Sequence, residues 1–310
     1  MQTYFILLLL LSAYSYGMEN KKDSFFLPKT TDIIADNVDS LVVDGIKHIS
    51  THGELFEARA GSGQQAFDVN YILTNPQDRV HSLRSPVAQK YLSRELLAYF
   101  DGSLDVDQGL SKASPFWKTL ADKDNKICSN YGHYVFHQTH PDTKKTQYQW
   151  VIDNLENNID SRKAFININQ LEHKHMDNKD FPCTLGMQFF VRNNRLCCDV
   201  SSRSTDIYTG LPYDMAFFSL VNELVYKDVK ERLPEKKSAE LKLGYTMMKT
   251  NFTQIYDKTR TPALKLLDKK SDIKIEMPPV HDAQETLSDI YKKTAHTPLV
   301  KWIHENAKLD

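Results

Sequence analysis

The sequence predicts an α+β fold, in which helices pack against a β-sheet. Residues 86–100 and 215–226 each place apolar side chains at helical spacing, which indicates two helices. Residues 164–169 alternate apolar and polar side chains, as a half-buried strand does. Residues 187–191 and 196–200 are short apolar runs that indicate two further strands. Helices and strands are therefore both expected.

Turn residues separate the last two predicted strands. Asn193 and Asn194 tolerate the positive φ angles that a tight hairpin requires, so we expect these strands to pair. This places Cys183 just ahead of the hairpin. A further helix is expected over residues 149–157, and another has Pro298 in its first turn.

The bulk composition is that of an ordinary globular protein. The chain has 310 residues, of which 41% are hydrophobic and 25% are charged, and this length allows one large core. It contains no fixed-period repeat and no Gly/Ser linker, so we expect one domain over residues 18–310. Residues 227–242 are highly charged and include Pro234, which favours a solvent-exposed insertion.

Charge and cysteine content exclude several classes of partner. The net charge of -1 gives no general attraction to nucleic acid, so we expect no nucleic acid polymer as a partner. The four cysteines show neither a C-x-x-C motif nor the spacing of a zinc site, which indicates reduced thiols and no bound metal. His173 and His175 suggest a metal pair, but an exposed charged loop is the favoured interpretation.

The N-terminus allows two interpretations. Residues 5–11 are continuously apolar and have the length of the hydrophobic part of a secretory signal, although they are too short to span a bilayer. The usual positive charge ahead of such a run is missing. Met18 is followed by a polar segment and would serve as a start for a cytoplasmic protein. Residues 1–17 are thus either a signal peptide of a secreted protein or an extension upstream of the true start.

The segment 180–214 gathers groups suited to chemistry on a phosphorylated substrate. It provides a thiol, an arginine that can bind an anion, a hydroxyl and two carboxylates. These are Cys183, Arg203, Ser204, Asp206 and Asp214. Asp214 also lies near the start of a predicted helix, so a helix-capping role is its structural alternative.

Glu95 falls inside the apolar stripe of the helix predicted over residues 86–100. Burial disfavours a charged carboxylate and raises its pKa, which suits proton transfer near neutral pH. A buried ion pair with an arginine is an equally acceptable interpretation.

Residues 180–224 resemble the thymidylate synthase family, and within it the branch of phage deoxycytidylate hydroxymethylases. Four upstream segments resemble the family in the same order, so that the similarity covers roughly residues 53–262. They are the loop Arg59-Ala-Gly-Ser-Gly, the helix segment YLSRELLAYF, the tyrosine segment Ser129-Asn-Tyr-Gly and the loop Asp160-Ser-Arg-Lys. The ordered set is far more specific than any one of its members.

The resemblance implies a fold and a reaction. The implied fold is a central mixed sheet packed by helices, dimerising through the sheet to form two shared active sites. A pyrimidine ring reacts at C5 only after a nucleophile adds to C6, and Cys183 is the candidate nucleophile. The implied one-carbon donor is 5,10-methylenetetrahydrofolate. An arginine such as Arg203 would lower the pKa of the thiol and promote the attack.

The other site residues receive roles from the resemblance. Arg59, Arg162, Arg203 and Ser204 would bind the phosphate of a pyrimidine nucleoside monophosphate, because guanidinium groups match its oxygens in pairs. Lys163 stands where the family usually has a second arginine. The remaining assignments are Glu95 for proton transfer, Tyr131 in the active site, and Asp206 with Trp117 beside the folate. For Trp117 a core aromatic is an equally simple account.

Asp214 bears on the choice of base. Thymidylate synthases have asparagine at this position, whereas the deoxycytidylate hydroxymethylases have aspartate, which complements the amino group of cytosine. Thr184 also resembles that branch. The resemblance therefore implies that dCMP, 5,10-methylenetetrahydrofolate and water give 5-hydroxymethyl-dCMP and tetrahydrofolate.

Two departures from the family keep alternatives open. After Gly244 the family has a His-x-Tyr pair that binds the sugar, and the sequence alignment puts Met247 and Lys249 there. The C-terminal KLD also lacks the short apolar ending of the synthases. The alternatives are a synthase acting on dUMP, an enzyme accepting a ribonucleotide, and a catalytically inactive nucleotide-binding relative.

Overall fold

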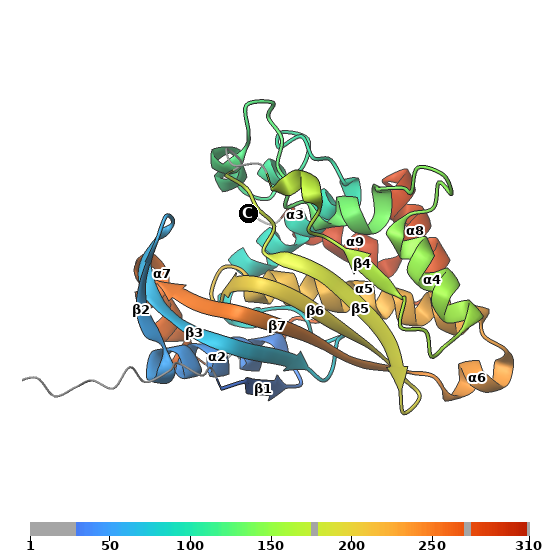
Figure 1. Ribbon diagram of the computed structural model, residues 1–310, viewed down its shortest axis with the longest axis horizontal. Coiled ribbons are helices and arrows are strands. Elements are labelled where there is room, and N and C mark those ends of the chain that lie inside the picture. Colours follow the sequence, from blue (N-terminus) through green and yellow to red (C-terminus); the bar gives the residue numbers. More distant parts are fainter. Residues whose placement is uncertain (1–28, 175–178, 270–273, 309–310) are drawn as a thin grey trace, which may run out of the picture.

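The computed structural model describes residues 29–174, 179–269 and 274–308. Within these ranges one mixed sheet of seven strands runs through the molecule, in the order β1-β3-β7-β6-β5-β4, with β2 paired to β3 (Figure 1). The strands are β1 (Thr31–Ala35), β2 (Glu54–Ala58), β3 (Gly61–Leu73), β4 (Phe165–Asn167), β5 (Thr184–Arg192), β6 (Arg195–Asp206) and β7 (Lys242–Tyr256).

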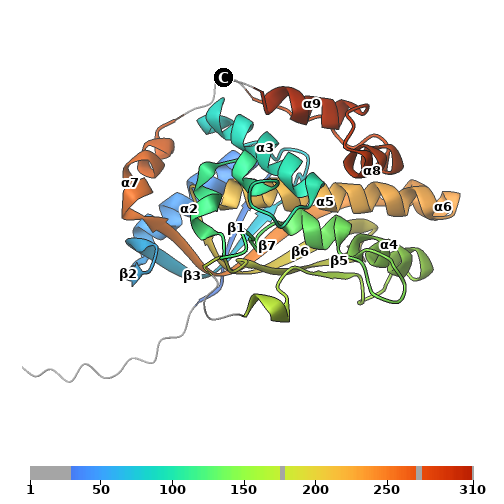
Figure 2. The ribbon, with the colours of Figure 1, turned by 90° about the horizontal axis from the view of Figure 1, so that it is seen from above.

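The helices gather mainly on one face of this sheet, while most of the opposite face carries no helix (Figure 2). The longer helices are α2 (Val38–His52), α3 (Val87–Asp101), α4 (Gln147–Asn157), α5 (Leu211–Arg232), α8 (Ala283–Lys292) and α9 (Pro298–Asn306). The shorter α6 (Glu235–Glu240) and α7 (Asp257–Leu264) flank β7, and single turns fill several loops. The predicted α+β class, with a central mixed sheet packed by helices, is confirmed.

The hairpin of β5 and β6 forms as predicted. Asn193 and Asn194 both adopt positive φ, 48° and 56°, and their turn joins two antiparallel strands. Both strands extend beyond the predicted apolar runs, because β6 continues with small and polar residues to Asp206 while still pairing with β7 in parallel. The strand predicted over residues 164–169 is shorter, since β4 spans Phe165–Asn167, although Ala164, Ile168 and Asn169 also form backbone hydrogen bonds with β5.

The predicted helices are present with somewhat different ends. The helix expected over residues 86–100 is α3, which ends where Gly102 adopts φ 68° and caps the last turn. Thr146 starts α4 with a reciprocal capping box to Gln149. Pro298 occupies the first turn of α9, as expected.

The charged residues after position 226 do not form a surface insertion throughout, which corrects the prediction. The helix α5 continues to Arg232, and Asp228 and Val229 on its last turns are buried. The Asp228 carboxylate accepts hydrogen bonds from the hydroxyl of Tyr148 at 3.1 Å and from Nε of Arg232 at 2.6 Å. Charge composition alone was misleading here because Asp228 is buried with a hydroxyl donor and a cation as its partners. Exposure begins at the end of α5, with Glu231 and Arg232, and continues through most of the segment with Pro234 and α6.

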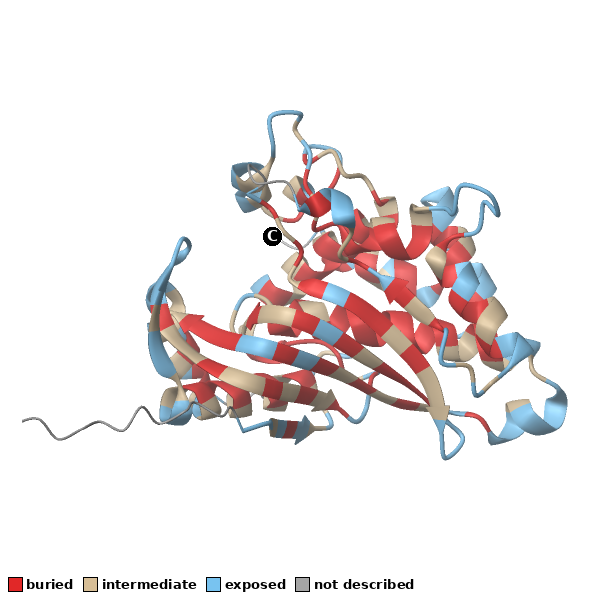
Figure 3. Cartoon of the chain, viewed as in Figure 1, coloured by how far each residue is buried: buried red, intermediate tan, exposed pale blue. Residues whose placement is uncertain are grey.

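The core lies between α5 and the sheet. Most residues of α5 as far as Val229 are buried, and Figure 3 shows this helix buried along most of its length. A helix surrounded by protein needs apolar residues on all sides, which explains why no polar stripe interrupts residues 215–221. The core thereby fixes the start of α5 relative to the ends of β6 and β7.

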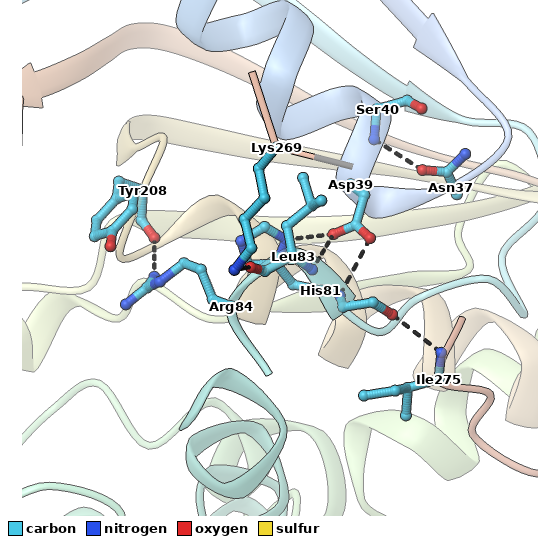
Figure 4. Close-up of polar contacts among 10 residues, drawn as sticks. Asn37, Asp39, Ser40, His81, Leu83, Arg84, Tyr208, Lys269 and Ile275 are labelled. Carbon is cyan, nitrogen blue, oxygen red and sulfur yellow. Dashed lines mark hydrogen bonds and ion pairs between the residues drawn. The ribbon is translucent and has the colours of Figure 1, made fainter. Parts of the chain in front are cut away.

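Polar contacts tie the segment before α3 to neighbouring elements (Figure 4). The Asp39 carboxylate on α2 accepts hydrogen bonds from Nδ1 of His81 at 2.5 Å and from the backbone N–H of Leu83 at 3.3 Å. Arg84 donates from a terminal nitrogen to the carbonyl of Tyr208 at 2.6 Å, and its guanidinium lies 3.8 Å from the Tyr208 ring centroid. Arg84 therefore connects the segment that precedes α3 to the loop between β6 and α5.

The signal-peptide question concerns residues 1–17, which lie outside the described residues. Within the part of the chain that the structure describes, no helix has both the length and the apolar character needed to cross a membrane.

Candidate active site

Cys183 lies immediately before β5, where the chain enters the sheet. Its carbonyl oxygen accepts hydrogen bonds from the backbone N–H of Arg203 at 2.9 Å and from the hydroxyl of Ser202 at 3.0 Å. Its Sγ lies 3.9 Å from Oγ of Ser204. The residue is partly exposed. Pairing with β6 therefore fixes the backbone of Cys183 and places its thiol beside Ser204.

Arg203 is held against the same segment. Its Nε donates to the carbonyl of Pro182 at 3.2 Å, a terminal nitrogen donates to the carbonyl of Phe181 at 2.7 Å, and the guanidinium lies 5.3 Å from the Phe181 ring centroid. Uncharged carbonyl groups do not neutralise the guanidinium. A fixed positive charge thus lies next to the thiol.

Burial raises the pKa of the Cys183 thiol, and the positive charge of Arg203 opposes that rise. Arg203 thus acts in the predicted direction. The net direction in the protein without substrate is nevertheless upward, because desolvation outweighs the charge and the nearby Asp214 carboxyl adds to the rise. Arg203 therefore lowers the pKa of the thiol as predicted, while burial determines the net direction.

Asp180 joins the segment before Cys183 to the loop that precedes Tyr131. Its carboxylate accepts hydrogen bonds from the backbone N–H of Cys128 at 2.6 Å and of Ser129 at 2.7 Å, and from the Ser129 hydroxyl at 2.5 Å. The side chain is buried, with 4% exposure. Asp180 was not among the predicted site residues, although its position directly before Phe-Pro-Cys was a signal.

Tyr131 is packed beneath the site by aromatic rings. It stacks on Tyr99 of α3 with ring centroids 5.6 Å apart and on Phe218 of α5 at 5.9 Å. The adjacent Asn130 donates from its amide to the carbonyls of Ala98 and Ser103 at 3.0 and 2.8 Å. These contacts fix the Tyr131 segment against the C-terminal end of α3.

Glu95 is buried on α3, as predicted, with 4% exposure. Its Oε1 accepts a hydrogen bond from the hydroxyl of Tyr91 at 2.8 Å, and Nε1 of Trp117 donates to that hydroxyl at 3.4 Å. Burial raises the pKa of Glu95 to about 8, the Tyr91 hydrogen bond opposes the rise, and the Asp214 carboxyl adds to it. The alternative interpretation was that Glu95 forms a buried ion pair with an arginine. Its hydrogen-bond partner is instead the tyrosine Tyr91.

Asp214 is the fourth residue of α5, and it does not cap the helix. The N-cap is Gly210, without a side-chain cap hydrogen bond, so the capping interpretation is wrong. Burial raises the pKa of the Asp214 carboxyl to about 7. The charge of this group acts on Glu95, Cys183 and Tyr131, which places all four near one another.

Asp206 ends β6 and organises the following turn. Its Oδ1 accepts hydrogen bonds from the backbone N–H of Tyr208 at 2.7 Å and of Thr209 at 2.8 Å. The turn precedes α5 and, through Tyr208, meets Arg84. Asp206 therefore helps to position the helix that carries Asp214.

Arg59 lies at the exposed tip of the hairpin formed by β2 and β3. One of its terminal nitrogens donates to the carbonyl of Lys179 at 2.8 Å. This contact brings the tip to the segment that leads into Cys183, although the two are more than a hundred residues apart in sequence. The structure thus joins Arg59 to the segment that carries the thiol.

Arg162 and Lys163 are not brought to the thiol of their own chain. They lie on the exposed loop between α4 and β4, where Phe165 pairs with Gln188. Extending that antiparallel register puts Lys163 level with Phe190, some seven residues along the strand from Cys183. At the usual rise per residue this corresponds to about 20 Å.

Met247 and Lys249 also lie away from the thiol. In the register of β6 and β7, Met247 pairs with Asp199 and Lys249 with Ser201, and Lys249 forms an ion pair of 2.7 Å with Asp199. The β7 residues level with Ser204 to Asp206 are instead Phe252, Thr253 and Gln254. The register therefore contradicts the placement of Met247 and Lys249 at the sugar-binding positions.

Tyr256 ends β7 and was not among the predicted site residues. Burial raises the pKa of its phenol, with contributions from Asp206 and Cys183, and Arg203 opposes the rise. Tyr256 therefore lies near the site residues. The sequence signal was available. Had the strand after Gly244 been extended beyond Lys249 with alternating side-chain directions, it would have indicated which β7 residues lie near Cys183.

The interpretation that His173 lies on an exposed loop is wrong. Its ring is buried, with 5% exposure of the residue, and Nε2 lies 2.7 Å from the hydroxyl of Tyr134. His175 lies outside the described residues. Among the residues that are described, no group of three or more His, Cys, Asp or Glu side chains is arranged to hold a metal ion.

One end of the mixed sheet carries a candidate nucleophile, a cation, carboxyl groups and aromatic rings. This combination defines an enzyme-like site. Residues 42–295 match the thymidylate synthase family, and the chain belongs to this family. Membership implies transfer of a one-carbon unit to C5 of a pyrimidine nucleotide. The family binds a pyrimidine nucleoside monophosphate and uses methylenetetrahydrofolate as co-substrate.

Proposed function

We propose that this protein is a deoxycytidylate hydroxymethylase. It converts dCMP, 5,10-methylenetetrahydrofolate and water to 5-hydroxymethyl-dCMP and tetrahydrofolate. The observation that carries the assignment is the buried carboxyl group of Asp214, whose charge acts on both Cys183 and Glu95. Family membership supports the reaction class, and Asp214 supports the choice of cytosine.

Cys183 acts as the nucleophile at C6 of the base. Addition of its thiolate forms the S–C6 bond and makes C5 electron-rich, so that C5 can attack a one-carbon donor. Because burial raises the pKa of the free thiol, the thiol must give its proton to another group when it adds to C6. A bound phosphate shared with Arg203 would not help, because it weakens the cation. Proton transfer from the thiol to a group already in the site therefore accompanies addition.

Arg203, Ser204 and Arg59 bind the phosphate. Arg203 and Ser204 are neighbours on β6, and the thiol lies 3.9 Å from the Ser204 hydroxyl. Arg59 is tethered to Lys179 by a single hydrogen bond at the tip of an exposed hairpin. A guanidinium on a hairpin tip can turn from a carbonyl to a phosphate, because the carbonyl accepts one hydrogen bond from it whereas a phosphate is an anion and can accept two in parallel.

Asp214 selects the base by forming hydrogen bonds with its edge. Cytosine presents an amino group as donor and N3 as acceptor, whereas uracil presents N3–H and O4. Because the pKa of Asp214 is raised to about 7, its carboxyl is partly protonated near neutral pH. The protonated group accepts from the amino group and donates to N3, so it complements both positions of cytosine. Tyr131 supports this end of the site from below.

Glu95 manages protons and the attacking water. It lies in the same buried site, with a pKa raised to about 8, so it can both hold and release a proton at physiological pH. It assists loss of the C5 proton, which accompanies cleavage of the bond between the transferred carbon and the folate nitrogen and releases tetrahydrofolate. It then assists addition of water to the resulting exocyclic methylene group of the nucleotide. The water oxygen becomes the hydroxyl of the product, and elimination of the Cys183 sulfur restores the aromatic ring.

Methylenetetrahydrofolate supplies the carbon that becomes bonded to C5. Trp117 is partly exposed and touches Tyr91, so its indole can pack against the pterin ring beside Glu95. The Asp206 carboxylate lies at the adjoining turn, where it holds the backbone that borders this position. We assign Trp117 and Asp206 to the folate side of the site.

The active protein is a homodimer with shared sites. Arg162 and Lys163 are exposed and lie about 20 Å from Cys183 along the sheet, so they reach a phosphate only in a second subunit. Leu185 on β5 and Phe252 on β7 are exposed apolar side chains of the sheet, and most of one face of this sheet carries no helix (Figure 2). A symmetric dimer packed through this face covers them and lends each loop to its partner.

Product analysis with several nucleotides tests the proposal. The purified protein is incubated with methylenetetrahydrofolate and C5-tritiated dCMP, dUMP or CMP, and tritium release and product mass are measured. We expect release from dCMP and a product heavier by one hydroxymethyl group in place of hydrogen. Release from dUMP alone would replace the assignment by thymidylate synthesis, and release from no nucleotide would favour an inactive relative.

A further inference from the structure

A cavity of about 220 Å³ lies behind α3, between this helix and the pair α8 and α9. Its walls are mainly apolar and include Leu97, Ile290 and Val300. Glu95 and Tyr91, the α3 residues of the candidate active site, do not line it. The cavity is therefore separate from the site around Cys183, and the inference does not depend on the proposed function.

The acidic side chains of the cavity are already used by the fold. Asp289 accepts hydrogen bonds from the backbone N–H of Thr297 at 2.7 Å and from the hydroxyl of Thr294 at 2.7 Å. Asp101 pairs with Lys293. These contacts connect α8 to α9 and to the end of α3, so neither carboxylate is available to a ligand without breaking them.

Two cations of the cavity have no such acidic partner within the described part of the chain. Arg94 donates from Nε to the carbonyl of Ala307 at 2.8 Å, which fixes the guanidinium without neutralising it. Lys112 also lines the cavity and belongs to none of the ion pairs among described residues. The cavity thus combines an apolar wall with an excess of positive charge at its rim.

We propose that this cavity binds a small organic anion with an apolar body, such as an aromatic or short aliphatic carboxylate. The apolar part packs against Leu97, Ile290 and Val300, and the carboxylate pairs with Arg94 and Lys112. A volume of 220 Å³ corresponds to about seven water molecules, which limits the ligand to a few carbon atoms or one ring. Guanidinium and carboxylate groups match in geometry, which favours a carboxylate over a neutral ligand.

Calorimetric titration of the full-length protein with benzoate and with hexanoate tests the inference. Benzamide and hexanamide, which have the same shape without the charge, serve as matched ligands. We expect saturable binding of at least one carboxylate, and binding of its amide that is about tenfold weaker or more. Equal affinity for acid and amide, or no saturable binding of either carboxylate at millimolar concentration, would overturn the proposal.

Substitutions locate the binding site. The double variant Arg94→Gln with Lys112→Gln should weaken carboxylate binding about tenfold or more. Lys90→Gln, on the same helix but outside the cavity, should leave it unchanged. Thermal unfolding checks that each variant is folded. If the double variant is not folded, the single variant Lys112→Gln is used in its place. Carboxylate binding that is unaffected by the folded variant, or that a saturating pyrimidine nucleotide abolishes, would place the ligand elsewhere.

Discussion

The hydroxyl of Tyr91 donates a hydrogen bond of 2.8 Å to Oε1 of Glu95, one turn further along α3. Both residues face the candidate active site, and Trp117 donates to the same hydroxyl from the other side. The Tyr91 ring is in turn packed against Tyr213 of α5, with centroids 4.5 Å apart. Tyr91 thus connects the acid with the aromatic residue assigned to the folate side.

Replacing Tyr91 by Phe should raise the pKa of Glu95 further. The hydrogen bond from Tyr91 favours the ionised carboxylate, so its loss disfavours that form. A hydrogen bond to a charged group contributes about 1.5 kcal/mol, which corresponds to roughly one pH unit. We expect the limb of the pH profile of kcat/KM that belongs to Glu95 to move up by as much as this amount.

Tyr213→Phe is the matched control, because it removes a hydroxyl from the neighbouring ring and leaves the hydrogen bond to Glu95 in place. Its pH profile should coincide with that of the unsubstituted protein. Identical profiles for Tyr91→Phe and the unsubstituted protein would show that the hydrogen bond does not influence the acid.

Glu95→Gln should change how stability depends on pH. The pKa of Glu95 is 4.5 in the unfolded chain and about 8 in the folded protein, so between these values the folded state holds a proton that the unfolded state has lost. The resulting stabilisation is fully present below pH 4.5 and is lost as pH rises toward 8, by at most about 1.4 kcal/mol per pH unit. The glutamine variant lacks this contribution to the slope.

Urea unfolding at several pH values between 5 and 8 measures the effect. The free energy of unfolding of the variant, minus that of the unsubstituted protein, should increase with pH. Asp214 contributes a slope of the same sign up to about pH 7, and it is present in both proteins, so it cancels from the difference. Parallel curves across the range would contradict a raised pKa for Glu95.

Cys183→Ala should abolish tritium release from C5 and leave nucleotide binding largely intact. Arg203 and Ser204 are held by β6 and do not depend on the thiol for their positions, so the phosphate contacts remain. Loss of a nucleophile typically costs on the order of 10⁴-fold or more in rate. Cys197→Ala, at a buried position in the same sheet, is the control and should stay active. Residual exchange in Cys183→Ala near the normal rate would assign the chemistry to another group.

Asp214→Asn should shift base preference toward dUMP. An amide cannot ionise and can present either orientation to the base, so about tenfold to a hundredfold of the preference for dCMP should be lost. In the unsubstituted protein the proton that pairs with cytosine N3 is lost above about pH 7, so preference for dCMP should decline there. The ratio of the Kd values for dCMP and dUMP, measured against pH, removes the common titration of the phosphate. If the ratio of Kd values is unchanged in the asparagine variant, Asp214 does not select the base through hydrogen bonds to its edge.

Mixed dimers test whether sites are shared. Arg162→Gln and Cys183→Ala each inactivate both sites of a homodimer if Arg162 acts in the partner's site. A heterodimer of the two variants has one site with both substitutions and one with neither, so a statistical mixture regains about a quarter of full activity. We expect this recovery when the two inactive proteins are unfolded and refolded together. Refolding each variant alone is the control, and no recovery in the mixture would confine Arg162 to its own subunit.

Local patterns in the sequence determined the class of fold and several elements. The apolar spacing over residues 86–100 predicted α3 with Glu95 on its buried face, and Asn193 with Asn194 predicted the hairpin behind Cys183. Each of these signals acts between residues that are close in sequence. Helical period, strand alternation and turn conformation are set by such neighbours, and they can therefore be read without tertiary information.

Only the tertiary structure decided which distant groups meet. The pairing of β6 with β7 moved Met247 and Lys249 away from the thiol, and burial outweighed the effect of Arg203 on the pKa of Cys183. Asp180 acquired its role because two loops meet at one carboxylate. Register and desolvation depend on contacts between residues far apart in the chain, and no local pattern contains them.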